Sequence, residues 1–142
     1  MMMNPQFPIE KAIINLINSY KNQITKKMRP LGLYPGQDMI LLELLKHGQV
    51  SQNKLVVELC VDHSTIAKSV RRMVSSDLIH TEKSTEDKRV TLVSLTEHGH
   101  DLAKKVEEIW VTSECCATDG LSEEEQRLFI EMIDRITKNL NK

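Results

Sequence analysis

Polar and basic side chains gather on one face of a helix predicted near the middle of the chain, HSTIAKSVRRMVSS, residues 63–76. Its apolar residues recur at helical spacing and are Ile66, Val70, Met73 and Val74. The opposite face carries His63, Ser64, Thr65, Lys68, Arg71 and Arg72. Short polar groups at the start of such a helix can reach base edges in the major groove, and longer cations can bind phosphates. The pattern predicts nucleic-acid contact, and its alternative is a solvated helix face with paired charges.

The segment just before it, SQNKLVVELC, predicts a short helix that Ser51 caps, with Leu55 and Leu59 facing inward. A tight connector follows, in which Asp62 or His63 is placed to cap the next helix. Two short helices joined by such a turn predict a helix-turn-helix. Ser51 and Gln52, at the start of the first helix, are then placed to touch the DNA backbone.

From Leu78 the pattern changes to the period of two that is typical of strands. The sequence reads LIHTEK, a polar tip STED and then KRVTLVSL, which is rich in β-branched residues. We expect a two-stranded hairpin with a charged tip.

The remaining segments predict helices. One apolar stripe runs from Ile9 to Met28 and ends at Pro30 and Gly32, and the run MILLELL predicts a buried helix that closes at His47 and Gly48. Another helix begins at Thr96 and breaks at Asp119 and Gly120. Ser122 and Glu125 form the capping box of a last helix, with these residues inside: Phe129, Met132, Ile133, Ile136 and Leu140. The predicted order is four helices, two strands and two helices, a mainly α fold.

Two motifs in this order resemble the MarR family of bacterial transcriptional regulators. The hairpin tip reads Asp87-Lys88-Arg89, and the second strand ends in Leu95-Thr96-Glu97-His98-Gly99. The resemblance covers essentially the whole chain. It implies a winged helix-turn-helix DNA-binding domain in residues 35–95, flanked by dimerisation helices in residues 1–34 and 96–142. It also implies a homodimer that binds a pseudo-palindromic double-stranded operator, most simply as a repressor. A cytoplasmic location is expected separately, because the sequence shows no secretory signal.

The resemblance assigns a minor-groove contact to Arg89, with Lys88 beside it and Asp87 as its support. A guanidinium group is favoured in a narrow groove of negative potential. The predicted DNA-binding residues are Ser51, Gln52, His63, Ser64, Thr65, Lys68, Arg71, Arg72, Lys88 and Arg89.

Some positions depart from the family pattern. Asp77 stands where relatives usually have glycine, so the turn into the wing is either shaped differently or capped by the Asp77 side chain. Thr81 replaces a frequent arginine, and Ala67 and Ser69 are smaller than many counterparts. These differences concern the operator sequence rather than the mode of binding.

The composition and the distribution of charge are compatible with DNA binding. The net charge is −1, but the first ninety residues carry +4 and residues 97–142 carry −5, which leaves room for a basic face. No apolar run approaches the roughly 18 residues of a membrane span, and no secretory signal is evident. No catalytic cluster, glycine-rich phosphate loop or metal-ligand set appears, so we expect neither an enzyme nor a cofactor.

The mode of regulation has several candidates. Relatives commonly release DNA on binding a small aromatic or phenolic acid, but no motif identifies the ligand residues here. Peroxide-sensing relatives use a cysteine in the first helix, whereas the cysteines of this chain are Cys60, Cys115 and Cys116. Alternatives are a thiol- or metal-responsive regulator that uses Cys115 and Cys116, and a winged helix that binds only protein partners.

Overall fold

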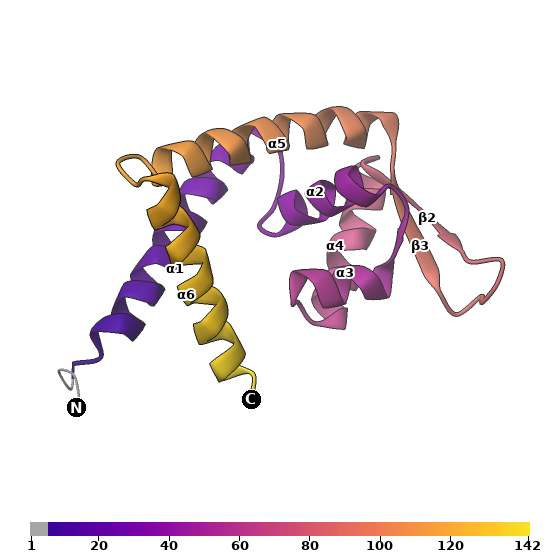
Figure 1. Cartoon of the computed structure of the whole chain (residues 1–142). Helices are drawn as coiled ribbons and strands as arrows, with labels where there is room; N and C mark the ends of the chain where they lie inside the picture. Colours follow the sequence, from indigo (N-terminus) through magenta and orange to yellow (C-terminus); the bar gives the residue numbers. More distant parts are fainter. Residues whose placement is uncertain (1–5) are drawn as a thin grey trace. The chain divides into compact units, whose positions relative to one another are not determined.

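The computed structural model describes residues 6–142, so residues 1–5 of the predicted N-terminal segment 1–34 lie outside the described residues. The helices are α1 Pro8–Met28, α2 Gln37–His47, α3 Gln52–Leu59, α4 His63–Ser75, α5 Glu97–Ala117 and α6 Glu123–Leu140, with a short 3₁₀ helix η1 Arg29–Leu31 (Figure 1). The strands are β1 Val50–Ser51, β2 Ile79–Lys83 and β3 Thr91–Leu95. The predicted mainly helical fold with a β-hairpin is confirmed.

The chain divides into two compact units, one ending at Glu107 and one covering Glu108–Lys142, and each is described by itself. In the first unit, β2 and β3 form the predicted hairpin, which projects beyond the helices in Figure 1. The prediction of only two strands was wrong, because β1 pairs antiparallel with β3 and gives the order β1-β3-β2. Val50 lies opposite Val93. A two-residue strand is too short to show a period, and only its pairing with β3 defines it.

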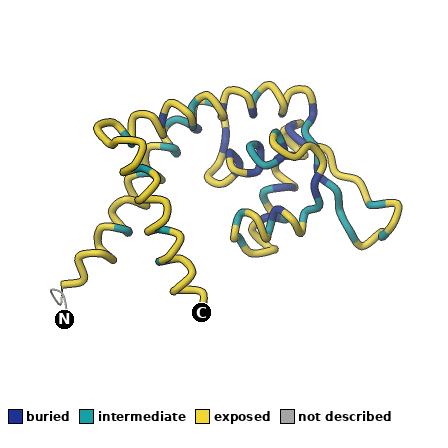
Figure 2. Tube along the Cα trace, in the orientation of Figure 1, coloured by how far each residue is buried: buried dark blue, intermediate teal, exposed yellow. Residues whose placement is uncertain are grey.

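The core of the first unit lies among α2, α3, α4 and the sheet, where Figure 2 shows most of the buried chain. Its fully buried side chains include Ile40, Leu41, Leu44, Leu55, Met73 and Val93. The predicted inward face of α4 is confirmed for Ile66, Val70 and Met73, but the burial of Val74 was wrong, since Val74 is 42% exposed. Val74 instead borders a surface groove.

Helix starts follow the local capping signals. Ser51 Oγ accepts a hydrogen bond from the backbone N–H of Lys54, and Asp62 caps α4 by accepting from the backbone N–H of Thr65. The capping box of Ser122 and Glu125 is complete at the start of α6. These predictions are confirmed. They could be made from the sequence because each cap joins residues only three positions apart.

The turn from α4 into β2 packs against the start of α5. Asp77 has a positive φ of 59°, a left-handed conformation that costs little for glycine. Gly99 lies so close to this turn that an added Cβ would meet the carbonyl oxygen of Leu78 at 1.9 Å. Only glycine fits this position without movement of the backbone.

In the second unit, α6 leaves its apolar residues uncovered. Phe129 is 45% exposed, Met132 is 56% and Leu140 is 79%, so the single chain leaves these predicted inner residues uncovered. The spacing of these residues is helical, as predicted, but no other element of this unit covers them. A helix of this type needs a partner surface to bury its apolar side.

Candidate nucleic-acid interface

The first turn of α4 is organised around the carboxylate of Asp62. One oxygen, Oδ1, accepts from the backbone N–H of Thr65 at 2.8 Å and from the hydroxyl of Ser64 at 2.7 Å. The other oxygen, Oδ2, accepts from the hydroxyl of Thr65 at 3.0 Å. Asp62 therefore caps the helix and also holds the two shortest side chains of the predicted DNA-binding face.

These hydrogen bonds favour the ionised form of Asp62. The hydroxyl of Ser64, followed by the N–H and hydroxyl of Thr65, lowers the pKa of Asp62 from 3.8 to about 2. Hydrogen bonds to a carboxylate favour its charged form. At neutral pH the group is an acceptor only.

The predicted DNA-binding residues of α4 are all exposed: His63, Ser64, Thr65, Lys68, Arg71 and Arg72. Arg72 differs from the others because its guanidinium lies 5.2 Å from the centre of the Tyr34 ring. This cation–π contact directs Arg72 toward the loop before α2. Tyr34 was not predicted, because no local pattern connects residues so far apart.

The wing tip is shaped by two short polar side chains. Ser84 Oγ accepts from the backbone N–H groups of Glu86 and Asp87, and Asp87 accepts from the backbone N–H of Arg89 at 3.0 Å. The backbone N–H of Ser84 also donates to Val90 across the turn at 2.9 Å. The tip is thus a closed, hydrogen-bonded turn at the end of the β2–β3 hairpin.

Arg89 and Asp87 form a bidentate ion pair at this tip. The guanidinium donates from Nε to Oδ1 and from Nη2 to Oδ2, each at 3.1 Å. This pair holds the pKa of Asp87 below its usual range. The side chain of Arg89 remains 90% exposed, so it is oriented without being covered. This is the geometry that the predicted support role of Asp87 requires, and the DNA contacts of Arg89 and of the exposed Lys88 remain predictions.

An open groove of about 540 Å³ lies between α4 and the wing strands. Its polar lining residues are Gln52, Arg71, Ser75, Thr81, Glu82, Lys83 and Thr91. Two contacts stiffen its wing side, since Gln49 donates to Glu82 at 2.8 Å and Lys83 donates to Thr91 at 2.9 Å. Gln52 and Arg71 both line this groove, whereas the hydroxyl oxygen of Ser51 accepts the hydrogen bond that caps α3.

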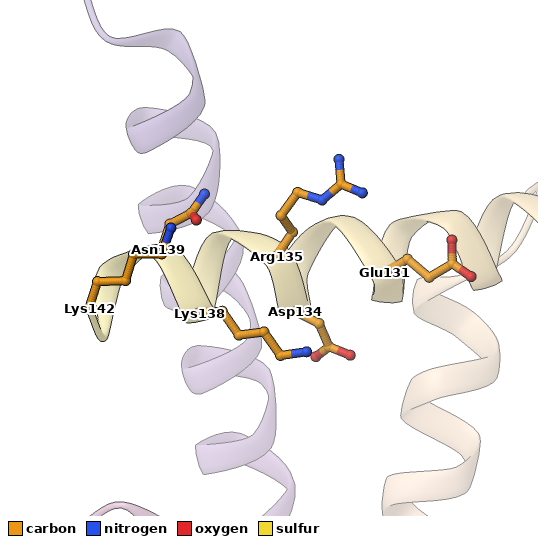
Figure 3. Close-up of a pocket in the computed structure, with 6 residues that line it drawn as sticks. All are labelled: Glu131, Asp134, Arg135, Lys138, Asn139 and Lys142. Carbon is orange, nitrogen blue, oxygen red and sulfur yellow. The ribbon is translucent and has the colours of Figure 1, made fainter.

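A second hollow, of about 470 Å³, lies along α6 and has six polar lining residues (Figure 3). Their side chains diverge, and Arg135 points to a different side of the helix from Asp134 and Lys138. They share no common point where a ligand could bind. Within residues 6–142, no group of three or more His, Cys, Asp or Glu side chains is placed to hold a metal ion.

Comparison with known proteins identifies the family to which the chain belongs. A sequence model of the MarR family matches residues 33–91. The organic hydroperoxide resistance transcriptional regulator of Bacillus subtilis is 32% identical over 106 residues, which cover 71% of each chain. The chain belongs to the MarR family of transcriptional regulators. All ten predicted DNA-binding residues of this MarR-family protein lie within the matched segment.

Other relatives are consistent with this membership. The transcriptional regulator YdgJ of B. subtilis is 31% identical over 104 residues, which cover 71% of this chain but only 62% of YdgJ. The structure of the Staphylococcus aureus MepR–DNA complex superposes with a TM-score of 0.88 at 21% identity, covering 94% of this MarR-family chain and 99% of the other. That likeness shows the fold. No helix in the described part of the chain is long and apolar enough to cross a membrane.

Proposed function

We propose that this protein is a sequence-specific double-stranded DNA-binding repressor. The observation that carries the proposal is the exposed guanidinium of Arg89, held by Asp87 at the tip of a hydrogen-bonded wing, on the same unit as the exposed polar face of α4. In this proposal α4 enters the major groove and Arg89 the minor groove. The structurally similar MepR forms a complex with DNA, which supports DNA binding by a protein of this fold.

The proposal includes a homodimer, in which residues 1–34 and 96–142 provide the dimerisation helices and residues 35–95 bind DNA. One winged domain covers one half-site, so two-fold symmetry gives a pseudo-palindromic operator with half-sites one helical turn, about 10 bp, apart. The uncovered apolar residues of α6, such as Met132 and Leu140, and those of α1, such as Ile9 and Ile17, support it. Light scattering should find a dimer, and a monomer at micromolar concentration would count against it.

Release by a small aromatic or phenolic acid is the regulatory part of the proposal. A ligand can weaken DNA binding only by its preference for one conformation over the other, typically about 1 to 3 kcal/mol. Quenching of Trp110, the single tryptophan, provides a screen for such ligands. The protein would act in the cytoplasm, where a bacterial operator is located.

A thiol-responsive regulator is the second candidate, because Cys60, Cys115 and Cys116 are all exposed. The name of the B. subtilis relative refers to organic hydroperoxides, which oxidise accessible thiolates. Treatment with cumene hydroperoxide should then release DNA from the native protein but not from a C115S/C116S variant. Equal release from both would exclude these two thiols.

Footprinting on DNA from upstream of the protein's own gene tests the main proposal. We expect one protected region with approximate two-fold symmetry and half-sites about 10 bp apart. Uniform protection that unrelated DNA removes equally would indicate non-specific binding. A complete lack of protection would favour a winged helix that binds only protein partners.

A further inference from the structure

The hydroxyl groups of Ser64 and Thr65 have their protons committed inside the free protein. Each hydroxyl has one proton and two lone pairs. Each lies within hydrogen-bond distance of a different oxygen of Asp62, at 2.7 Å for Ser64 and 3.0 Å for Thr65. Because an ionised carboxylate can only accept, both hydroxyls must be the donors. Only the lone pairs of these hydroxyl oxygens are left to form hydrogen bonds with a DNA base.

We infer that Asp62 is a specificity-determining residue, which sets the hydrogen-bonding direction of Ser64 and Thr65 so that the start of α4 reads base edges that donate. In the major groove the donating groups are N6–H₂ of adenine and N4–H₂ of cytosine. Guanine, with N7 and O6, and thymine, with O4, offer only acceptors there. Two acceptors form no hydrogen bond with each other, so guanine and thymine are disfavoured as the base that either hydroxyl contacts, and the partner base on the other strand is then the one that accepts.

The negative charge of Asp62 supports this direction of the hydrogen bonds from Ser64 and Thr65. The lowered pKa of Asp62 means that the carboxylate is ionised throughout the physiological range. Exclusion of water by DNA would strengthen these charge-assisted bonds rather than release the protons. The inference rests on the proposed DNA binding and adds to it which class of base the recognition helix selects.

The variant Asp62→Asn separates hydrogen-bond direction from helix capping. Oδ1 serves the backbone N–H of Thr65, which requires an acceptor, so the amide oxygen stays at that position. The amide NH₂ then replaces Oδ2 and faces the hydroxyl of Thr65, which becomes an acceptor and turns its proton outward. Asparagine caps a helix as well as aspartate does, so α4 keeps its start.

The experiment is selection from a randomised DNA pool, followed by sequencing, with the full-length chain. Thr65→Val keeps the shape of the side chain and marks the base pair that Thr65 reads. Because every base pair has one donating base, the contacted donor is identified with amino-free analogues at that pair: purine in place of adenine, or pyrimidin-2-one in place of cytosine, should weaken binding by the native protein but not by T65V. On the strand that carries this donor, Asp62→Asn should shift the preference toward guanine or thymine by roughly three- to tenfold, the range for one hydrogen bond. The double variant D62N/T65V lacks the hydroxyl that Asp62 directs, so it should show no such shift relative to T65V alone.

Glu58→Gln is the matched control. Glu58 is an exposed carboxylate on α3, outside the hydrogen bonds of Ser64 and Thr65, so its loss changes the charge without changing their direction. It should raise affinity for all DNA alike and leave base preference unaltered. Thermal melting of each variant checks that the fold is retained.

Several results would overturn the inference. It would be contradicted if the amino-free analogue weakened binding by the native protein and by T65V equally, or if T65V changed no position. It would also fail if D62N behaved like E58Q, because Asp62 would then act through charge alone. If the native protein binds DNA but D62N keeps its preference, only this inference fails; if the native protein binds no DNA, the proposed function fails and this inference with it.

Discussion

The hydroxyl of Thr96 donates a hydrogen bond to the backbone carbonyl of Asp77 over 2.7 Å and thereby joins the start of α5 to the turn between α4 and β2. The same oxygen accepts from the backbone N–H of Gly99 at 2.9 Å, and the backbone N–H of Thr96 donates to Leu78 at 3.1 Å. Asp77 has the left-handed φ at this turn. One buried threonine therefore fixes the helix start and the base of the wing together.

Replacement of Thr96 by valine should destabilise the protein. Valine keeps the shape of the side chain but removes the donor for Asp77 and the acceptor for Gly99, both in a buried setting. We expect a loss of about 1 to 3 kcal/mol in the free energy of unfolding, measured by urea denaturation. Thr96→Ser keeps the hydroxyl and is the control; equal losses in the two variants would show that the hydroxyl contributes nothing.

Gly99→Ala should also destabilise the protein, although it lies in a helix. In an unhindered helix this change is favourable by about 1 kcal/mol. Here the added Cβ meets backbone atoms of Leu78, which cannot rotate away, so we expect a net loss of about 1 to 3 kcal/mol. His100→Ala, at an exposed position of the same helix, is the control for propensity. A more stable G99A variant would contradict the close contact.

Stability should depend on Asp62 at acid pH. Its pKa is lowered to about 2 in the folded chain from a usual 3.8, so its stabilising effect is complete above 3.8 and is lost as the pH falls toward 2. The native protein should therefore lose more stability than D62N between pH 5 and pH 2, measured by urea denaturation at each pH. Parallel curves for the two proteins would show that the hydrogen bonds to Asp62 do not stabilise the fold.

Arg89→Ala should weaken operator binding by about 1 to 3 kcal/mol and leave the melting temperature unchanged. The side chain is exposed and bonds only within the wing tip, so the core does not depend on it. Arg89→Lys should weaken binding as well, because lysine lacks the planar guanidinium that a narrow minor groove favours. Arg135→Ala, which removes an exposed arginine of α6, is the charge control. Unchanged binding by R89A at physiological salt would refute the assignment.

Local signals made much of this fold predictable. Ser51, Asp62 and Ser122 each cap a helix through a residue three positions away, and the burial of α4 follows its spacing. The strand β1 was missed because two residues have no pattern without β3. Long-range contacts, such as that of Arg72 with Tyr34, could not be predicted from local sequence patterns either.

The same contrast between local and long-range features applies to the candidate DNA-binding site. Residues at the start of α4 and at the wing tip could be selected from their types and from the family resemblance. Their hydrogen-bond directions could not, because the commitment of Ser64 and Thr65 to Asp62 depends on side-chain conformations. On α6, the helical spacing defined an apolar face that includes Phe129, but it could not show what covers that face.

DNA binding is tested most directly by an anisotropy titration of the full-length chain against labelled DNA from upstream of its own gene, at about 50 and about 200 mM salt. A protein that neutralises six to ten phosphates should lose about 10³- to 10⁵-fold in affinity between these concentrations. We expect a loss of this order, with competition by the specific sequence and not by unrelated DNA. Binding that is absent or insensitive to salt would contradict the central claim that α4 and the wing of Arg89 bind DNA.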